Sequence, residues 1–205
     1  MNADSRSDVS AGTLRRRVDS LIADTRTLLA SHGVSRESLA RVRERLQQLA
    51  GERALFSAER FPSVPAGTGR LYTLHEDADG SFALYVNVCG PQVRSPAHDH
   101  STWAVIAGIE GEEFNTFYSV DPAAGDVAVR VTGEKTIGPG DAIALMPQDV
   151  HSIDTRDQPR VACLHFYGRG LPQQTDRRAF PAAGAEPGTQ PAKYAPQPEI
   201  VRWNE

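Results

Sequence analysis

The sequence predicts a mainly β protein that carries a layer of helices at its N-terminus. From residue 13 to about residue 60, apolar residues recur mostly at three- and four-residue steps, which is typical of amphipathic helices. After residue 61, short apolar segments alternate with proline and glycine turns, which indicates a β-sandwich or β-barrel. We therefore expect a disordered segment over residues 1–12, a helical layer over 13–60 and a β domain over 61–205.

Local signals divide the helical layer into separate helices. Gly33 is expected to end the first helix, and Ser35 is a suitable N-cap for the second. Gly51 ends that second helix, and a short helix over residues 54–59 follows. The arginines of this layer form no catalytic constellation, so we expect it to pack on a sheet and face solvent.

The β domain contains several short apolar segments separated by turn residues. The expected strands are Leu71–His75, Phe82–Cys89, Thr102–Ile109, Glu113–Ser119, Val127–Thr132, Ala142–Met146 and Arg160–Tyr167. Residues from about 172 to 198 are rich in proline, alanine, glycine and glutamine, and we expect an irregular loop that wraps the surface. Ile200–Trp203 is a candidate for one last strand.

Composition and charge exclude several classes of function. The 205-residue chain has a net charge of −4 and no long basic stretch, so we expect no nucleic-acid partner. Its apolar runs are too short for a membrane span, and its polar N-terminus lacks the apolar centre of a signal peptide. Cys89 and Cys163 do not make a disulfide framework, which favours a cytoplasmic protein.

The histidines of the β region suggest a metal site. His98 and His100 stand two residues apart, the spacing that places side chains on one face of a strand. His151 follows about fifty residues later, after the segment IALMPQDV. A lone histidine in a sheet is usually an ordinary polar residue. An H-x-H pair joined by a later histidine is the layout of a small β-barrel that binds one metal from two adjacent strands. Three neutral imidazoles suit Fe, Zn, Ni or Cu better than Mg or Ca.

This arrangement resembles the cupins, which carry an H-x-H motif followed shortly by Glu and a second motif of the P-x-G-x-x-H type. Here the first motif is His98-Asp99-His100, and Pro147 precedes His151 in the second. The resemblance implies a single cupin barrel, that is, a double-stranded β-helix or jelly roll.

One departure from the cupin pattern points to a particular branch. No glutamate follows His100 within the first motif, because Glu110, Glu112 and Glu113 come too late and lie past the expected strand. A set of three histidines without a carboxylate is similar to that of the cysteine dioxygenase-like, or thiol dioxygenase, family in its bacterial form. The resemblance implies one Fe(II) per chain, held by His98, His100 and His151.

A second motif supports the same family. The segment ACLHFYGRGL places Cys163, His165 and Tyr167 at alternate positions of one strand, so they share a face. The family carries a Ser-x-His-x-Tyr triad here, which implies catalytic roles for Tyr167 and His165, with Cys163 in the position of the serine. A thiol is a weaker donor than a hydroxyl, which leaves the polarisation of His165 open. Mammalian-type members also cross-link the tyrosine to a cysteine, but Ala104 or Val105 occupies that position here, so Tyr167 is expected to be free.

The family resemblance implies oxidation of a small thiol to a sulfinate with both atoms of O2. Arginines bind the substrate carboxylate in this family, and the candidates for substrate binding here are Arg70, Tyr72, Arg177 and Arg178. Cysteine, 3-mercaptopropionate and mercaptosuccinate all stay open as substrates, and two arginine clamps would suit the dicarboxylate. A monomer and a homodimer are both compatible with the sequence.

Two other readings also remain open. Another metal-dependent cupin enzyme would usually keep the cupin glutamate. A non-catalytic cupin that binds a ligand as a sensor would commonly be joined to a DNA-binding segment. The N-terminal helices carry arginines at residues 15–17 but no clear helix-turn-helix.

Overall fold

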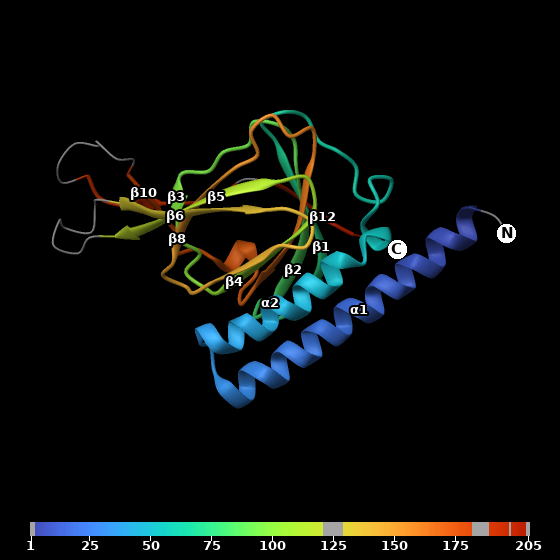
Figure 1. Ribbon diagram of the computed structural model, residues 1–205. Helices are drawn as coiled ribbons and strands as arrows, with labels where there is room; N and C mark the ends of the chain where they lie inside the picture. Colours follow the sequence, from blue (N-terminus) through green and yellow to red (C-terminus); the bar gives the residue numbers. More distant parts are fainter. Residues whose placement is uncertain (1–2, 121–128, 182–188, 197, 204–205) are drawn as a thin grey trace.

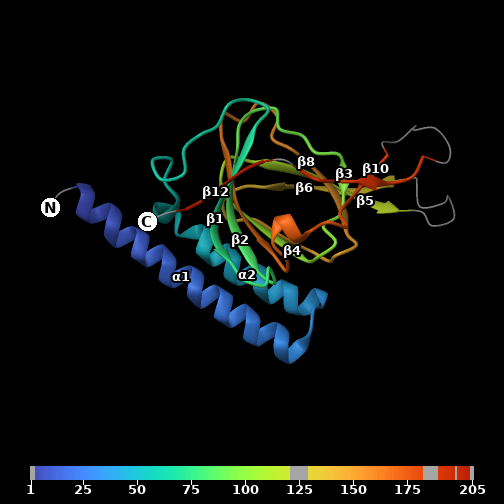
Figure 2. The ribbon, with the colours of Figure 1, turned by 180° about the vertical axis from the view of Figure 1, so that it is seen from behind.

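A computed structural model describes residues 3–120, 129–181, 189–196 and 198–203, with side chains from residue 11 onward. Two six-stranded sheets face each other in a barrel, and two long helices lie side by side across the outside of it (Figure 1). The view from behind shows the same two layers, with both helices on one side of the barrel (Figure 2). This arrangement confirms the expected mainly β architecture with N-terminal helices.

The first sheet has the strand order β12-β1-β2-β9-β4-β7. Its strands are β1 (Gly69–Glu76), β2 (Ala83–Cys89), β4 (Ala104–Glu110), β7 (Ala142–Leu145), β9 (Val161–Tyr167) and β12 (Glu199–Arg202). Neighbouring strands are antiparallel except for β12, which runs parallel to β1.

The second sheet has the order β11-β10-β3-β8-β5-β6. Its strands are β3 (Ala97–His98), β5 (Glu113–Val120), β6 (Val129–Ile137), β8 (Val150–Asp154), β10 (Arg178–Phe180) and β11 (Ala192–Lys193). In its described residues, the expected irregular loop from about residue 172 to 198 contains the short strands β10 and β11, and the 3₁₀ turn η3 (Leu171–Gln173) lies at its start. Pairing with β3 holds β10 in place, and this long-range contact leaves no periodic signal in so short a segment.

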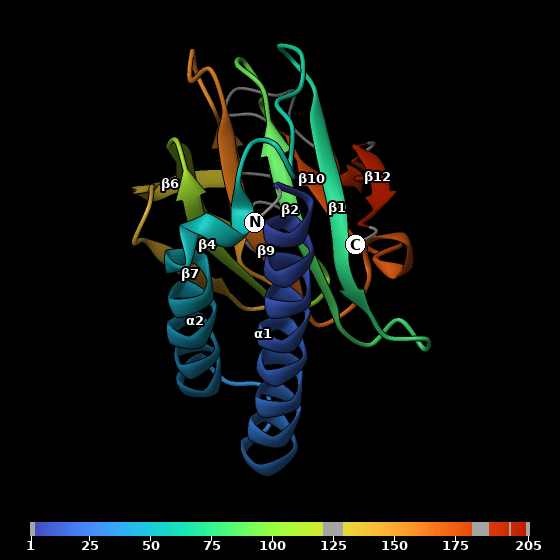
Figure 3. The ribbon, with the colours of Figure 1, turned by 90° about the vertical axis from the view of Figure 1, so that its right-hand side faces the viewer.

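The helices α1 (Ala3–His32) and α2 (Arg36–Gly51) begin and end largely where the sequence indicates. Gly33 has a φ of +68°, and Ser35 forms a capping box with Ser38. α2 packs against β4 and β7, while α1 packs against α2 and β1. In the side view both helices extend beyond the sheet (Figure 3). None of the helices in the described part of the chain is long and apolar enough to cross a membrane.

The structure differs from the sequence-based expectation in two places within this layer. α1 begins at Ala3, although we expected disorder through residue 12, and the absence of glycine and proline from residues 3–11 permits this extension. The expected short helix over residues 54–59 is instead the 3₁₀ turn η1 (Arg53–Phe56).

The first sheet separates two apolar clusters. One cluster lies between this sheet and the helices, and the other fills the barrel interior. β9 is buried along its whole length, with Leu164 and Phe166 in the helix-side cluster and Cys163 and Tyr167 in the barrel. The alternation of side chains along a strand thus decides which residues of β9 can take part in a site.

Candidate metal centre and its cavity

Three histidines meet inside the barrel. His98 lies on β3 directly opposite His151 on β8, and His100 follows β3. One potential ligand atom from each of the three lies within 4.8 Å of the others, and all three side chains are buried. The structure therefore brings together the histidines that the sequence singles out.

Hydrogen bonds leave a nitrogen lone pair available on each ring. His98 Nδ1 donates to the Pro96 carbonyl at 3.0 Å, and His151 Nδ1 donates to Asn115 Oδ1 at 2.8 Å, so Nε2 is the acceptor nitrogen in both. His151 Nε2 and His100 Nδ1 are buried without a hydrogen-bond partner among the described residues. Burial lowers the pKa of all three imidazoles, that of His151 to about 3, which keeps them neutral. Neutral, converging and unpartnered nitrogens fit a transition-metal ion.

The histidines open onto a cavity of about 650 Å³. Its wall also contains His165, Tyr167, Arg177 and Tyr194. Such a volume suits a small molecule held by a few polar groups.

Tyr167 and His165 form a buried hydrogen-bonded pair beside the histidine cluster. His165 Nδ1 lies 2.8 Å from the Tyr167 hydroxyl, and the Tyr167 and His100 ring centroids are 5.6 Å apart. Burial raises the pKa of Tyr167, so its phenol stays protonated. On the neighbouring strand Ala104 lies directly opposite Tyr167.

Cys163 lies on the same face of β9 but makes no hydrogen bond to His165 in the described structure. Burial raises the pKa of the Cys163 thiol well above the usual range, although a hydrogen bond from the backbone amide of Ile109 acts in the opposite direction. The expected contact between the residue in the serine position and His165 is therefore not seen.

Glu113 is a polar residue of the barrel interior that was not among the site residues expected from the sequence. The first residue of β5, it is fully buried, and its carboxylate, the Cys163 thiol and a His165 ring nitrogen lie within 4.8 Å of one another. Burial raises the pKa of Glu113 to about 7, although a hydrogen bond from Asn115 acts in the opposite direction. The signal for this residue is the alternation of Glu113 and Asn115 along β5, which puts both on the inner face.

Arg177 is buried in the cavity wall and is only 4% exposed. Its Nη1 donates to Gln174 Oε1 at 3.2 Å, and its guanidinium carbon lies 5.2 Å from the centre of the Tyr194 ring. Among the described residues no carboxylate forms an ion pair with it, and its Nε has no hydrogen-bond partner. Burial lowers the pKa of Arg177, but from so high a value that the group stays charged.

The other three substrate-binding candidates occupy different surroundings. Arg70 lines the cavity, but its Nη2 lies 2.6 Å from Glu199 Oε2. Tyr72 is not part of the cavity wall: its ring packs on Phe61 in the helix-side cluster, with centroids 5.2 Å apart. Its hydroxyl still reaches Arg70 Nη1 at 3.4 Å.

Arg178 also lies outside the cavity wall. Its side chain is about half exposed and binds the buried carboxylate of Asp99. Of the four candidates for carboxylate binding, the structure thus leaves Arg177 as the buried and unpaired cation.

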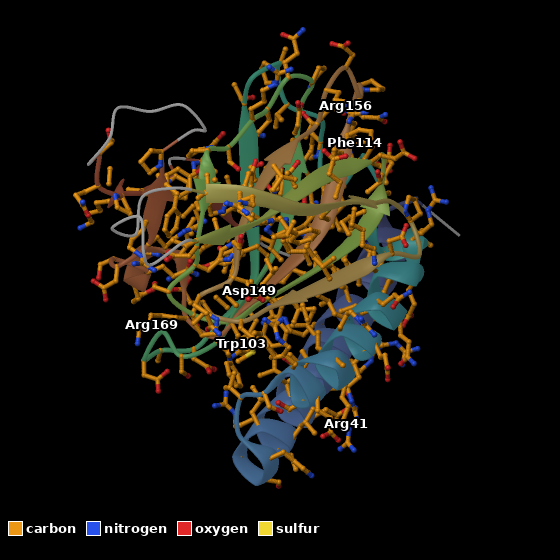
Figure 4. All side chains as sticks on the ribbon, turned by 60° about the vertical axis from the view of Figure 1, so that its left-hand side comes forward. Arg41, Trp103, Phe114, Asp149, Arg156 and Arg169 are labelled. Atoms are coloured by element: carbon orange, nitrogen blue, oxygen red, sulfur yellow. The ribbon has the colours of Figure 1, made fainter. Side chains whose placement is uncertain are left out.

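Trp103 packs in the helix-side core rather than facing the histidines. Its ring lies 5.0 Å from that of Phe166 and 5.7 Å from that of Phe82. Figure 4 places it at the end of the barrel far from Arg156, whose guanidinium carbon lies 3.5 Å from the centre of the Phe114 ring.

Comparison with known proteins matches no protein-family model. Among solved structures, a double-stranded β-helix protein from Klebsiella pneumoniae subsp. pneumoniae is 15% identical, with a TM-score of 0.43 over 56% of this chain and 84% of that one. A cupin superfamily protein from Desulfitobacterium hafniense is 11% identical, with a TM-score of 0.41 over 57% and 86%. The DMSP lyase DddQ from Ruegeria pomeroyi is 17% identical, with a TM-score of 0.42 over 64% and 60%. For a further DMSP lyase structure the match spans 45% of that chain.

The fold is a single cupin barrel. The two facing six-stranded sheets described above give this architecture directly. Inside the barrel, the lining of one cavity includes three imidazoles, a phenol and a guanidinium. Together these groups can hold a metal ion and a small anionic ligand side by side.

Proposed function

We propose that this chain is a mononuclear non-haem Fe(II) thiol dioxygenase that acts on a small mercapto-carboxylate. The reaction is RSH + O2 → RSO2H, in which both oxygen atoms are added to sulfur and the thiol becomes a sulfinic acid. The resemblance of its two histidine motifs and its His-x-Tyr segment to that family supports the proposal.

The burial of Arg177 without a carboxylate partner is the observation that supports a carboxylate-containing substrate. A buried guanidinium without a carboxylate partner is costly, and a ligand carboxylate in the same cavity as the histidines would satisfy it. Arg70 is already neutralised by Glu199 at the cavity wall. One available cation favours a monocarboxylate thiol such as cysteine or 3-mercaptopropionate over the dicarboxylate mercaptosuccinate.

His98, His100 and His151 would hold the metal, and their neutral, unpartnered nitrogens fit it. When bound, Fe(II) would favour the thiolate form of the substrate and supply the redox chemistry that O2 requires. Arg177 would bind the substrate carboxylate, and the protonated Tyr167 would donate a hydrogen bond to the reacting groups. The hydrogen bond to His165 orients Tyr167, and the apolar barrel interior limits access of water.

We also propose a cytoplasmic location. Cys89 and Cys163 are buried free thiols, as expected in a reducing compartment.

Oxygen consumption tests the proposal. The Fe(II)-loaded chain is assayed with cysteine, 3-mercaptopropionate, mercaptosuccinate and cysteamine, with product identification by mass. We expect thiol-dependent uptake and a sulfinate product, both lost in His151→Ala. The matched control His32→Ala replaces an exposed histidine of α1 and leaves uptake unchanged.

Two outcomes would overturn the proposal. Oxygen uptake with cysteamine equal to that with the acids would show that binding of a carboxylate by Arg177 does not select the substrate. Bound iron without oxygen uptake for any thiol would favour the alternative that the chain is a non-catalytic, ligand-binding cupin.

A further inference from the structure

Polar contacts link a metal-ligand histidine to the tyrosine through the interior of the barrel. His151 Nδ1 bonds Asn115 Oδ1 at 2.8 Å, and Asn115 Nδ2 donates to Glu113 Oε1 at 3.0 Å. The second oxygen of Glu113, Oε2, lies 3.9 Å from His165 Nε2, while the other nitrogen of His165 bonds Tyr167. Glu113 is therefore the junction between the His151 side and the Tyr167 side of the site.

The geometry at Glu113 fixes the orientation of Asn115. A carboxylate oxygen can only accept a hydrogen bond, so the amide nitrogen of Asn115 must face Glu113 and its oxygen must face His151. The proton of His151 then lies on Nδ1, which leaves Nε2 free as a donor to a metal.

The same carboxylate has one oxygen to spare. Glu113 Oε2 is buried without a hydrogen-bond partner among the described residues. Its separation from His165 Nε2 is longer than a hydrogen bond, but a hydrogen bond between them would satisfy this buried oxygen. A proton on Nε2 would leave Nδ1 to accept from the Tyr167 hydroxyl.

We propose that Glu113, and not Cys163, is the positioning residue that sets the tautomer of His165 and thereby orients Tyr167. Glu113 would fill the role that the family resemblance assigns to the residue at position 163. As a statement about catalysis this inference rests on the proposed function, whereas the proton position on His165 does not depend on it.

Two competing assignments use the same atoms. Asn87 Nδ2 lies 3.4 Å from His165 Nε2, and donation from this amide would place the imidazole proton on Nδ1 instead. Alternatively, Glu113, Cys163 and His165 could hold a second metal ion. The carboxylate is favoured over the amide because a hydrogen bond to a charged acceptor is stronger.

The test reads the tautomer directly. The full chain, labelled with ¹⁵N-histidine, is studied by long-range ¹H–¹⁵N spectroscopy at pH 8, both metal-free and loaded with Zn²⁺, and His165→Gln identifies the signal. We expect the Nε2–H tautomer in the unsubstituted protein. In Glu113→Gln the new amide can donate to Nε2, so the Nδ1–H tautomer should appear. Loaded with Fe(II), this variant should lose about tenfold to a hundredfold in thiol-dependent O2 uptake at unchanged iron content.

Glu112→Gln is the matched control, because Glu112 is the exposed neighbour of Glu113 and lies outside the site. It should change neither the tautomer nor the uptake. An Nδ1–H tautomer in the unsubstituted protein would assign the contact to Asn87 and overturn the proposal, even if Glu113→Gln failed to fold. A second Zn²⁺ per chain that is lost in Glu113→Gln would also overturn it. The expected tautomers without uptake for any thiol would leave Glu113 as assigned and refute only the dioxygenase function.

Discussion

Asp99 accepts two hydrogen bonds from Arg178, from the backbone N–H and from Nε, each at 2.8 Å. Asp99 stands between His98 and His100, and Arg178 directly follows Arg177 in the chain. The pair therefore ties the segment that carries Arg177 to the segment that carries two of the candidate metal ligands.

Arg177→Met should reduce kcat/KM for mercapto-carboxylates on the order of 10- to 100-fold, because a hydrogen bond to a charged group contributes about 1.5–3 kcal/mol. Steady-state O2 uptake with 3-mercaptopropionate and with cysteamine checks this, and only the acid should be affected. Arg70→Met should have a smaller effect, since Glu199 already pairs with Arg70. A larger loss of kcat/KM in Arg70→Met than in Arg177→Met would mean that Arg70 binds the substrate carboxylate.

Asp99→Ala should lower the free energy of unfolding by about 1–3 kcal/mol, because Asp99 is buried and its hydrogen bonds to Arg178 are lost. It should also raise KM for mercapto-carboxylates, since Arg177 loses its anchor. Urea unfolding and O2 uptake measure the two effects. Arg41→Ala, which removes an exposed pair with Glu37, should change stability by less than about 0.5 kcal/mol. Equal effects of the two variants would mean that the Asp99 pair does not hold this segment.

Asp77 should make the free energy of unfolding depend on pH in the acidic range. Burial acts to raise its pKa, but hydrogen bonds from Arg26, Ser81 and His75 outweigh burial and lower it to about 2. Because the folded pKa lies below the ordinary value of 3.8, the stabilisation is complete above about pH 4 and is lost as pH falls towards 2. Asp77→Asn should therefore cost up to about 2 kcal/mol at pH 7 and almost nothing at pH 2.

Thermal or urea unfolding across this pH range measures the difference between Asp77→Asn and the unsubstituted protein. Asp24→Asn is the control, because the pair of Asp24 with Arg45 is about half exposed. A constant difference between Asp77→Asn and the unsubstituted protein from pH 7 to pH 2 would refute the electrostatic origin.

Gly168→Ala should destabilise the protein by about 1–3 kcal/mol. A Cβ at residue 168 would lie 2.3 Å from Trp103 Nε1 and 2.7 Å from Thr102 Oγ1, both in a packed region. Gly133→Ala is the matched control, since a Cβ there meets no atom within 4 Å. Denaturant midpoints compare the two variants, and equal midpoints would show that Trp103 moves freely aside.

The histidine cluster could be predicted from the sequence because its signals are local. The alternation of His165 and Tyr167 follows from the two-residue period of a strand, and the H-x-H spacing marks the first two histidines although His100 follows β3 rather than lying on it. Only the pairing of β3 with β8 brings His151 to them. The helix boundaries at Gly33 and Ser35 were predictable from local signals as well, since capping depends on adjacent residues.

Glu113 and the ion pairs of the arginines could not be predicted in this way. Glu113 stands in a run of acidic residues after a turn. Its alternation with Asn115 puts both side chains on one face of β5, but only the pairing of β5 within the sheet decides that this face is the inner one. Glu199 neutralises Arg70 because β12 pairs with β1, a contact across 129 residues of sequence. Such contacts depend on tertiary pairing and leave no periodic trace in the chain.

The short strands β10 and β11 directly follow Arg177 and precede Tyr194 of the cavity wall, respectively, and have few backbone hydrogen bonds, whereas β2 and β9 lie in the centre of a sheet. Amide hydrogen exchange should therefore separate the molecule into two cooperative units. Amides of β10 and β11 should exchange through a local opening, and those of β2 and β9 only through global unfolding. Because β10 pairs with β3 at His98, opening of the segment that carries Arg177 would also loosen one of the candidate metal ligands, so ligand capture and metal retention would be coupled.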